Sequence, residues 1–246
     1  MRTLIVAFAW ITPLMVIILW PASPVTGIAI MACSHALLLY ATLRPNVQWL
    51  GPVITHFETS RHEIWLTLDD GPTDDTPAIL DMLAARGVRA TFFVKGTLAG
   101  AHPDHLSAIE AGGHTIGNHS YSHPSAFFWC LPPADIAAQI DRCNAIIGAA
   151  RWFRAPVGMK NPAVHPALLQ RGMGLIGWSV RGFDTVTADP ERVTARIVPR
   201  IAPGAIIVMH QGRPHSVACI TRVVDELQRA GYAFVIPADD RLKTNR

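Results

Sequence analysis

The stretch LTLDDGPT, residues 66–73, joins an apolar run to two adjacent carboxylates and a turn. Side chains alternate along a strand, so Asp69 and Asp70 should point in opposite directions unless the strand ends there. Two carboxylates this close disfavour each other's ionisation, and a nearby cation would relieve the repulsion. The stretch therefore predicts a strand that ends at a site for a cation.

After residue 63, short apolar runs alternate with helical patterns. Strands that alternate with helices of about 10–15 residues predict parallel βαβ units with the helices outside. We expect an α/β domain over residues 63–246, after an irregular linker over residues 46–62. Strands are expected at residues 64–68, 90–94, 114–117, 152–154, 174–180, 205–209 and 232–236, and helices at residues 76–87, 103–112, 133–150, 162–171, 190–201 and 216–230.

The N-terminal segment, residues 1–45, has the composition of a membrane anchor. From residue 4 to residue 43 it has no acidic residue, no lysine or arginine and one histidine. PASP at residues 21–24 divides it into two apolar pieces near the lower end of the roughly 17–25 residues that span a bilayer. A cleaved signal peptide is the alternative, but an A-x-A cleavage site is missing and a second apolar run follows. We expect a retained anchor, most simply a hairpin of two transmembrane helices.

Several other functions are disfavoured by the composition. The net charge is only +3, and the basic residues are scattered rather than gathered in the stripe typical of nucleic-acid binding. The four cysteines have neither CxxC nor CxxH spacing, so neither a zinc ribbon nor a disulfide framework is indicated.

The polar residues that could carry chemistry follow the ends of the expected strands. In a parallel barrel the carboxyl ends of the strands share one face, where active sites of this architecture are built. The sequence thus gathers seven residues at one expected site: Asp69, Asp70, His119, His123, Arg154, Asp184 and His210.

A metal site is indicated by GNHSYSH, which places His119 and His123 four residues apart. This spacing brings two imidazoles to one face of a helical turn. Ser120 stands where an HExxH metalloprotease needs glutamate, so that motif is absent. Asp70 is the natural third ligand, which completes a two-histidine, one-carboxylate set for zinc or a similar divalent ion.

The second aspartate, Asp69, is expected beside the metal as a general base that takes a proton from the water the metal makes more acidic. Arg154 is placed to pair with Asp69. Pro156 fixes the chain so that the backbone N–H of Val157 faces a developing oxyanion. On the opposite side, His210 could protonate a leaving amine. Together these parts predict a metal-dependent amide hydrolase.

Taken in order, LTLDDGPT, HSYSH, FRAPVG and IVMH resemble the motifs of the NodB-homology polysaccharide deacetylases, carbohydrate esterase family 4. The resemblance covers about residues 64–236. It implies a distorted (β/α) barrel of about seven parallel strands that removes N-acetyl, or occasionally N-formyl, groups from amino sugars. It also implies Asp69 as catalytic base, Arg154 as its orienter, His210 as catalytic acid, and Asp70, His119 and His123 as ligands of zinc, with cobalt or nickel as alternatives.

Two positions depart from the family pattern. The fourth motif usually reads DxxDW, but WSVRGFDT has Arg181 at the first acidic position and keeps Asp184. Either Asp184 becomes the partner of His210, or the Arg181 cation leaves His210 with a lowered pKa. Arg181 could instead bind an anionic part of the substrate, for example a lipid-linked phosphate. Val157 stands where an aromatic residue is usual, which preserves a backbone N–H but removes a sugar-stacking ring.

The sequence therefore predicts a membrane-anchored deacetylase that acts on an amino sugar in a polysaccharide or lipid-linked glycan. The alternative is a catalytically impaired, membrane-anchored glycan-binding protein of the same fold. The expected location is the inner membrane of a bacterium. If both apolar helices span, Arg2 and Arg44 lie on one side and the positive-inside rule places the domain in the cytoplasm. A single span would place it outside.

Overall fold

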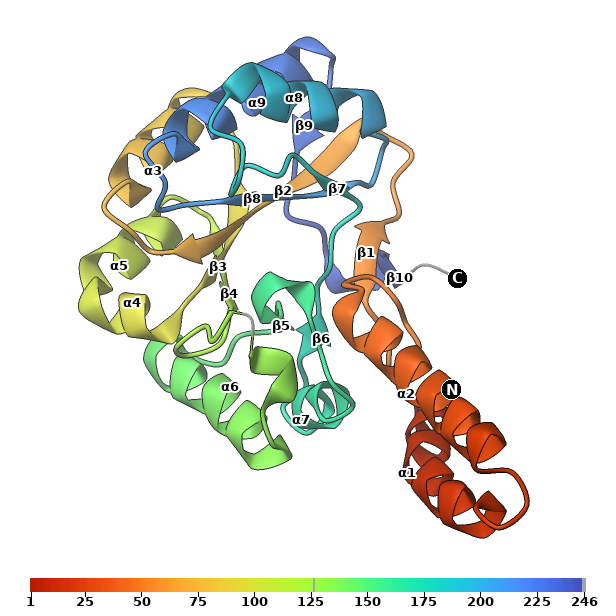
Figure 1. The fold of residues 1–246 in the computed structure, drawn as a ribbon. Helices are drawn as coiled ribbons and strands as arrows, with labels where there is room; N and C mark the ends of the chain where they lie inside the picture. The colour runs from red at the N-terminus through yellow and green to blue at the C-terminus, as the bar shows by residue number, and fades with distance from the viewer. Residues whose placement is uncertain (126, 245–246) are drawn as a thin grey trace.

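A parallel sheet forms the centre of the computed structural model, which describes residues 1–125 and 127–244 (Figure 1). Seven strands follow the order β6-β5-β4-β3-β2-β8-β7, and β9 also pairs with β2; all these pairs are parallel. This distorted barrel confirms the predicted fold class. The strands are β2 (Glu63–Gly71), β3 (Ala90–Val94), β4 (Thr115–Asn118), β5 (Trp152–Phe153), β6 (Gly174–Leu175), β7 (Val180–Arg181), β8 (Ile206–His210) and β9 (Ala233–Phe234).

Helices wrap around the outside of the sheet, as βαβ units require (Figure 1). Proline at the first helical turn, where the missing N–H costs little, begins α3, α5, α6 and α8. The helices are α3 (Thr76–Ala85), α4 (Gly96–Ala101), α5 (Pro103–Ala111), α6 (Pro133–Ile147), α7 (Val164–Leu169), α8 (Pro190–Ile197) and α9 (Ser216–Arg229), with 3-10 turns η1 (Phe128–Cys130), η2 (Pro156–Gly158), η3 (Val198–Arg200) and η4 (Asp239–Arg241).

The central strand β2 is buried on both faces. Ile64, Leu66 and Leu68 pack with side chains of α3 and α9 outside the sheet. Trp65 lies on the other face, in a cluster inside the barrel with residues of β3, β5 and β8. The two-residue alternation of the strand then places Asp69 on the inner face, at the carboxyl end.

The run predicted as one strand over residues 174–180 forms two strands instead. The first part of the run, β6, pairs with β5. The last part, β7, pairs with β8. Between them the backbone N–H of Ile176 donates to Phe153 O at 2.8 Å, and that of Ser179 donates to Ile206 O at 3.0 Å. The run therefore changes partner along its length, which closes the barrel with a distorted seam.

The linker prediction expected residues 46–62 to be irregular, but part of this range forms a strand. This strand is β1 (Ile54–Phe57), which pairs antiparallel with β10 (Leu242–Thr244) at the other end of the chain. The N–H of Phe57 also donates to Gly204 O at 2.9 Å. The partners of this short strand are distant in sequence, so no local pattern indicates it.

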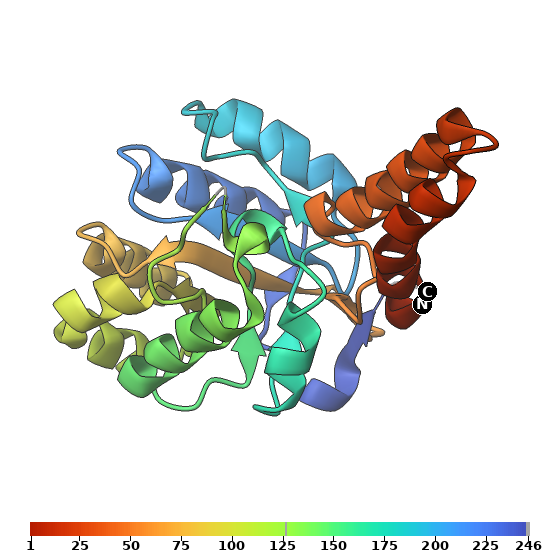
Figure 2. The same cartoon turned by 60° about the horizontal axis from the view of Figure 1, so that its bottom comes forward.

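Two apolar helices, α1 (Arg2–Leu19) and α2 (Pro24–Leu43), pack against each other as a hairpin that projects from the domain (Figures 1 and 2). Both are long and apolar enough to cross a membrane, a test that a signal sequence also passes. Only 11% of the apolar stretch of α1 and 22% of that of α2 are buried, so most of these residues are exposed or only partly covered. A buried hydrogen bond joins Thr12 Oγ1 to Ser34 Oγ at 2.7 Å between the helices.

The end of α2 is attached to the loop that follows β5. Lys160, which is fully buried, donates from Nζ to Arg44 O at 2.9 Å and to Pro45 O at 2.8 Å. Its backbone N–H donates to Thr42 O at 3.1 Å. Burial lowers the pKa of the Lys160 ammonium to about 8. These bonds satisfy carbonyls that the helix end leaves free and fix the hairpin to the domain.

Candidate active site

The two aspartates of the opening stretch reach one pocket because β2 contains an irregularity between them. Asp69 pairs with Phe93 of β3, and the next pair joins Gly71 to Val94, so Asp70 is the extra residue of a bulge. Its φ of 75° lies in the left-handed region. The bulge breaks the regular alternation that would send the second carboxylate to the opposite face.

Backbone strain is concentrated near this site. Among the described residues, five that are not glycine have positive φ: Asp70, Ser120, His123, Val157 and Phe183. Such conformations are uncommon for these residue types and cluster at functional sites. Three of the five line a pocket of about 460 Å³, whose lining includes Asp69, Asp70, His119, His123, Val157, Trp178, Arg181, His210 and Arg213.

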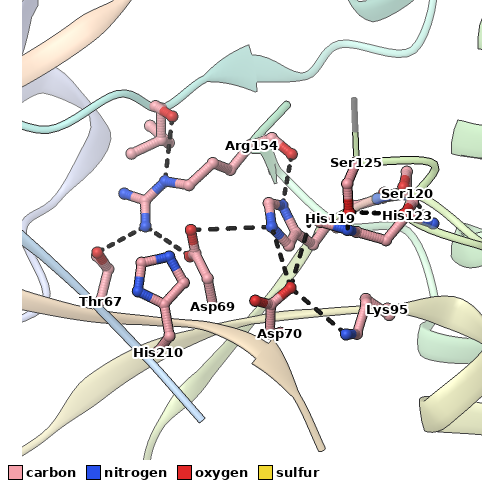
Figure 3. Close-up of polar contacts among 12 residues, drawn as sticks. Thr67, Asp69, Asp70, Lys95, His119, Ser120, His123, Ser125, Arg154 and His210 are labelled. Atoms are coloured by element: carbon pink, nitrogen blue, oxygen red, sulfur yellow. Dashed lines mark hydrogen bonds and ion pairs between the residues drawn. The ribbon is translucent and has the colours of Figure 1, made fainter. Parts of the chain in front are cut away.

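Asp70, His119 and His123 form a compact donor set (Figure 3). One potential ligand atom from each lies within 4.8 Å of the others. Asp70 Oδ1 is 3.4 Å from His123 Nε2, 3.9 Å from His119 Nε2 and 3.4 Å from Lys95 Nζ. This oxygen is buried without a hydrogen-bond partner in the described chain. A buried carboxylate oxygen that faces two imidazoles is suited to a cation.

The Nδ1 atom of each imidazole contacts a neighbouring oxygen, which orients the ring so that Nε2 faces the donor set. His119 Nδ1 donates to Arg154 O at 2.8 Å, because a carbonyl can only accept, and this leaves the Nε2 lone pair directed at Asp70. His123 Nδ1 lies 3.0 Å from Ser125 Oγ. Second contacts of this kind fix the ring orientation of metal-binding histidines.

The ionisation states also suit a metal. Burial lowers the pKa of His119, and it lowers the pKa of His123 to about 4, so both rings are neutral near pH 7. Burial raises the pKa of Asp70, but the charges that the two histidines carry in acid, together with Lys95, outweigh it and lower that pKa to about 2. Two neutral imidazoles and one carboxylate match the donor set of a catalytic divalent ion.

Asp69 is held apart from this set by a buried arginine (Figure 3). Arg154 Nη1 donates to Asp69 Oδ1 at 2.7 Å and to Thr67 Oγ1 at 2.7 Å, and Nη2 donates to Gly177 O at 2.8 Å. The guanidinium also lies 4.2 Å from the centre of the Phe93 ring. The other oxygen, Asp69 Oδ2, is 3.8 Å from His119 Nε2 and faces the pocket.

His210 lies at the end of β8, beside Asp69, which is its register partner on the neighbouring strand β2. Asp184 Oδ2 accepts from the backbone N–H of His210 at 2.7 Å, and Asp184 Oδ1 lies 3.1 Å from its Nδ1. Burial lowers the pKa of His210, but the hydrogen bond and charge of Asp184 outweigh it, so the pKa is raised. Of the two alternatives for His210, the pairing with Asp184 is the one that the structure has, although Arg181 occupies the usual acidic position, and the alternative of a lowered pKa is wrong.

Of the three predicted substrate-binding residues, two line the pocket and one does not. Val157 and Arg181 line the pocket, and the Val157 side chain is 44% exposed. Pro156 is buried and is not among the lining residues of this pocket. Lys95, which pairs with Asp70, was not predicted from the sequence. Lys95 directly follows β3, so the rule that site residues follow strand ends would have found it.

Comparisons with known proteins agree with these motifs and this geometry. The sequence model of the family described as polysaccharide deacetylase matches residues 56–176. A chitooligosaccharide deacetylase of Bradyrhizobium sp. is 30% identical over 190 residues, which are 69% of this chain and 86% of that relative. A peptidoglycan-N-acetylglucosamine deacetylase of Bacillus cereus is 30% identical over 189 residues, which are 72% of this chain and 67% of that relative.

Among solved structures, a CE4 family pseudoenzyme from Bacillus anthracis superposes with a TM-score of 0.68 and 27% sequence identity, covering 76% of this chain and 68% of that one. The fold, the ordered motifs and the length of the matches lead to one conclusion: the chain belongs to the polysaccharide deacetylase family.

Proposed function

We propose that this protein hydrolyses the N-acetyl group of an amino sugar within a glycan and uses a divalent metal ion to do so. Family membership supplies the reaction class, hydrolysis of an amide carbon–nitrogen bond. One observation carries the metal dependence: Asp70 Oδ1 is buried without a hydrogen-bond partner and faces two Nε2 atoms. The relatives named for chitooligosaccharide and peptidoglycan support a β-linked N-acetylglucosamine glycan as the substrate class, and an N-formyl group is the alternative acyl group.

The donor set favours zinc, with cobalt or nickel as alternatives. Asp70, His119 and His123 would hold the ion and leave further coordination positions open. When bound, the ion supplies Lewis acidity, which lowers the pKa of a coordinated water to about 7 and polarises the acyl carbonyl.

Asp69 is the general base in this proposal. Its Oδ2 faces the pocket, and it takes a proton from the water that attacks the acyl carbon. Arg154 Nη1 donates to Asp69 Oδ1 at 2.7 Å, which prevents the carboxylate from turning toward the metal ligands. Arg154 is thus a positioning residue.

Two further groups act on the acyl group, one at its carbonyl oxygen and one at its amine nitrogen. The backbone N–H of Val157, in a left-handed conformation on the pocket wall, is assigned to the oxyanion that forms on the carbonyl oxygen. His210 donates a proton to the leaving amine nitrogen, and Asp184 keeps it protonated by raising its pKa. Departure of the amine then yields acetate and the free amino sugar.

A catalytically impaired glycan-binding protein is the second candidate. The Arg181 departure and the likeness to a pseudoenzyme favour it. Against it, the pocket retains the proposed base, all three proposed ligands and the proposed acid, and a binding module needs no such complete set. Release of acetate by the metal-loaded protein decides between the two.

Replacing the two aspartates separately tests their division of roles. Asp69→Asn should lower acetate release from chitooligosaccharides and peptidoglycan fragments by about 10²–10⁴-fold, because the base is lost, while bound metal stays unchanged. Asp70→Asn should lower metal content, because a ligand charge is lost. Metal content is measured by mass spectrometry of the purified protein. Equal metal loss in both variants would contradict the assignment.

The pH dependence of turnover tests the role of Asp184. A group with a raised pKa keeps its proton at low pH and loses it as the pH rises through that pKa, so His210 should set the alkaline limb of kcat. Asp184→Asn removes the negative charge that helps to raise the pKa of His210 and leaves only one acceptor oxygen for its two N–H groups, so this limb should move to lower pH. Asp189→Asn, which alters a helix cap on α8, is the control. An unmoved limb in Asp184→Asn would refute the role.

We also propose that residues 1–45 anchor the catalytic domain, residues 63–246, in the inner membrane of a bacterium, with both helices spanning. Since α1 and α2 form a hairpin, both ends lie on one side, and Arg2 and Arg44 favour the cytoplasm. Alkaline phosphatase fused to the carboxyl end should then stay inactive, because its disulfides form only in an oxidising compartment. An active fusion would contradict this topology.

A further inference from the structure

Two arginines line the pocket without a role in the proposed chemistry, Arg181 and Arg213. Within residues 1–125 and 127–244, neither guanidinium pairs with a carboxylate. The carboxylates of the pocket are already engaged, since Asp69 pairs with Arg154 and Asp70 lies beside Lys95 and the two histidines. Arg181 and Arg213 therefore have no ion-pair partner in the described chain, although the charges of Asp184 and Asp69 act on Arg181 from a greater distance.

Arg181 is held in place by aromatic rings rather than by a hydrogen bond to an acid. Its guanidinium carbon lies 4.2 Å from the centre of the Phe183 ring and 5.5 Å from that of Trp178. Phe183 adopts a φ of 60°, a conformation uncommon for a bulky residue. Arg181 Nε is buried without a hydrogen-bond partner in the described chain. A buried donor without a partner is costly, and an anionic group of a ligand would satisfy it.

The planar guanidinium fork fits phosphate and carboxylate by paired hydrogen bonds. A neutral N-acetylglucosamine polymer offers neither group. A substrate that pairs with Arg181 would carry an anionic group close to the amino sugar.

The place of the pocket relative to the hairpin favours a phosphate attached to a lipid. Val157, Gly158 and Met159 line the pocket, and the next residue, Lys160, is hydrogen-bonded to the end of α2. A Cβ on Gly158 would lie 2.6 Å from Pro45, so the loop and the end of the helix are in direct contact. Figure 2 shows the hairpin projecting from the domain with α2 ending against it. The loop that forms one wall of the pocket therefore packs directly against the end of the proposed membrane helix α2.

Exposed apolar side chains at the pocket agree with a nearby lipid surface. Val186 is 82% exposed, Val157 is 44% exposed, and both line the pocket; Phe183, beneath Arg181, is 39% exposed. Apolar side chains next to a cation suit the boundary between acyl chains and phosphate groups.

We propose that Arg181, assisted by Arg213, binds the phosphate of an amino sugar joined through a phosphodiester to a membrane lipid. This inference rests on the proposed deacetylase function and narrows its substrate class. The lipid stays in the bilayer beside α2 while its phosphate contacts Arg181 and its N-acyl group enters the pocket. Arg181 is then a specificity-determining residue.

The test compares three probes with the full-length, metal-loaded protein in lipid vesicles. They are N-acetylglucosamine joined by a phosphodiester to a farnesyl chain, neutral chitotetraose, and a muramic-acid disaccharide that carries a carboxylate. Arg181→Met should lower kcat/KM for the phosphodiester about 10- to 100-fold more than for chitotetraose, because a charge-assisted hydrogen-bond pair is lost. Arg181→Lys should recover part of the loss, and Arg213→Met should act in the same direction with a smaller effect.

Arg200→Met is the matched control, because Arg200 is an exposed arginine of η3 that does not line the pocket. It should change neither rate. Equal losses for the phosphodiester and chitotetraose in Arg181→Met would overturn the proposal, as would a selective loss for the carboxylate disaccharide alone.

A binding measurement separates failure of this inference from failure of the proposed function. Asp69→Asn protein, which should bind without turnover, is titrated with the phosphodiester by calorimetry, with and without Arg181→Met. Binding that weakens about tenfold or more supports the phosphate site even if no probe releases acetate. Unchanged binding overturns it, whether or not the protein deacetylates chitotetraose.

Discussion

Arg154 is fully buried, and its contacts join the segments that make the site. Its guanidinium donates to Thr67 and Asp69 of β2 and to the carbonyls of the seam between β6 and β7, while its own carbonyl accepts from His119. A buried charge is tolerated only when its donors are satisfied, and removing one partner of such a pair typically costs about 3–5 kcal/mol. The need to satisfy the hydrogen-bond donors of this guanidinium therefore fixes the relative positions of the proposed base Asp69, the proposed metal ligand His119 and the seam between β6 and β7.

The bulge at Asp70 complements this constraint. A regular strand would send consecutive carboxylates to opposite faces, whereas the bulge brings both to one pocket. Arg154 holds Asp69, and Asp70 is left to face the two imidazoles. Two neighbouring residues of the same type thus have different partners, and our mechanism depends on that difference.

Much of the fold and the site could be predicted from the sequence. The strand-end rule placed Asp69, His119 and His210 on one face because each lies at or just after the end of an expected strand. Features that depend on distant parts of the chain could not be predicted. The β1-β10 pair joins the two ends of the domain, and the run predicted over residues 174–180 changes partner because its neighbours diverge.

Local backbone geometry could not be predicted from the sequence pattern either. Neither the positive φ of Asp70 nor that of Phe183 follows from residue type, since tertiary contacts impose both conformations. The pairing of Asp184 with His210 likewise depends on how the loop after β7 approaches β8. The substitution at Arg181 is visible in the sequence, but its stacking on Phe183 and its free Nε are visible only in three dimensions.

The central claim is that Asp70 binds a metal ion and Asp69 does not. Anomalous diffraction from crystals of the zinc-loaded protein, measured on both sides of the zinc edge, tests it directly. The account predicts a single ion bonded to Asp70, His119 and His123 at about 2.0–2.2 Å, with Asp69 outside the coordination sphere and still paired with Arg154. An ion bonded to Asp69, or no ion among these three residues, would contradict it.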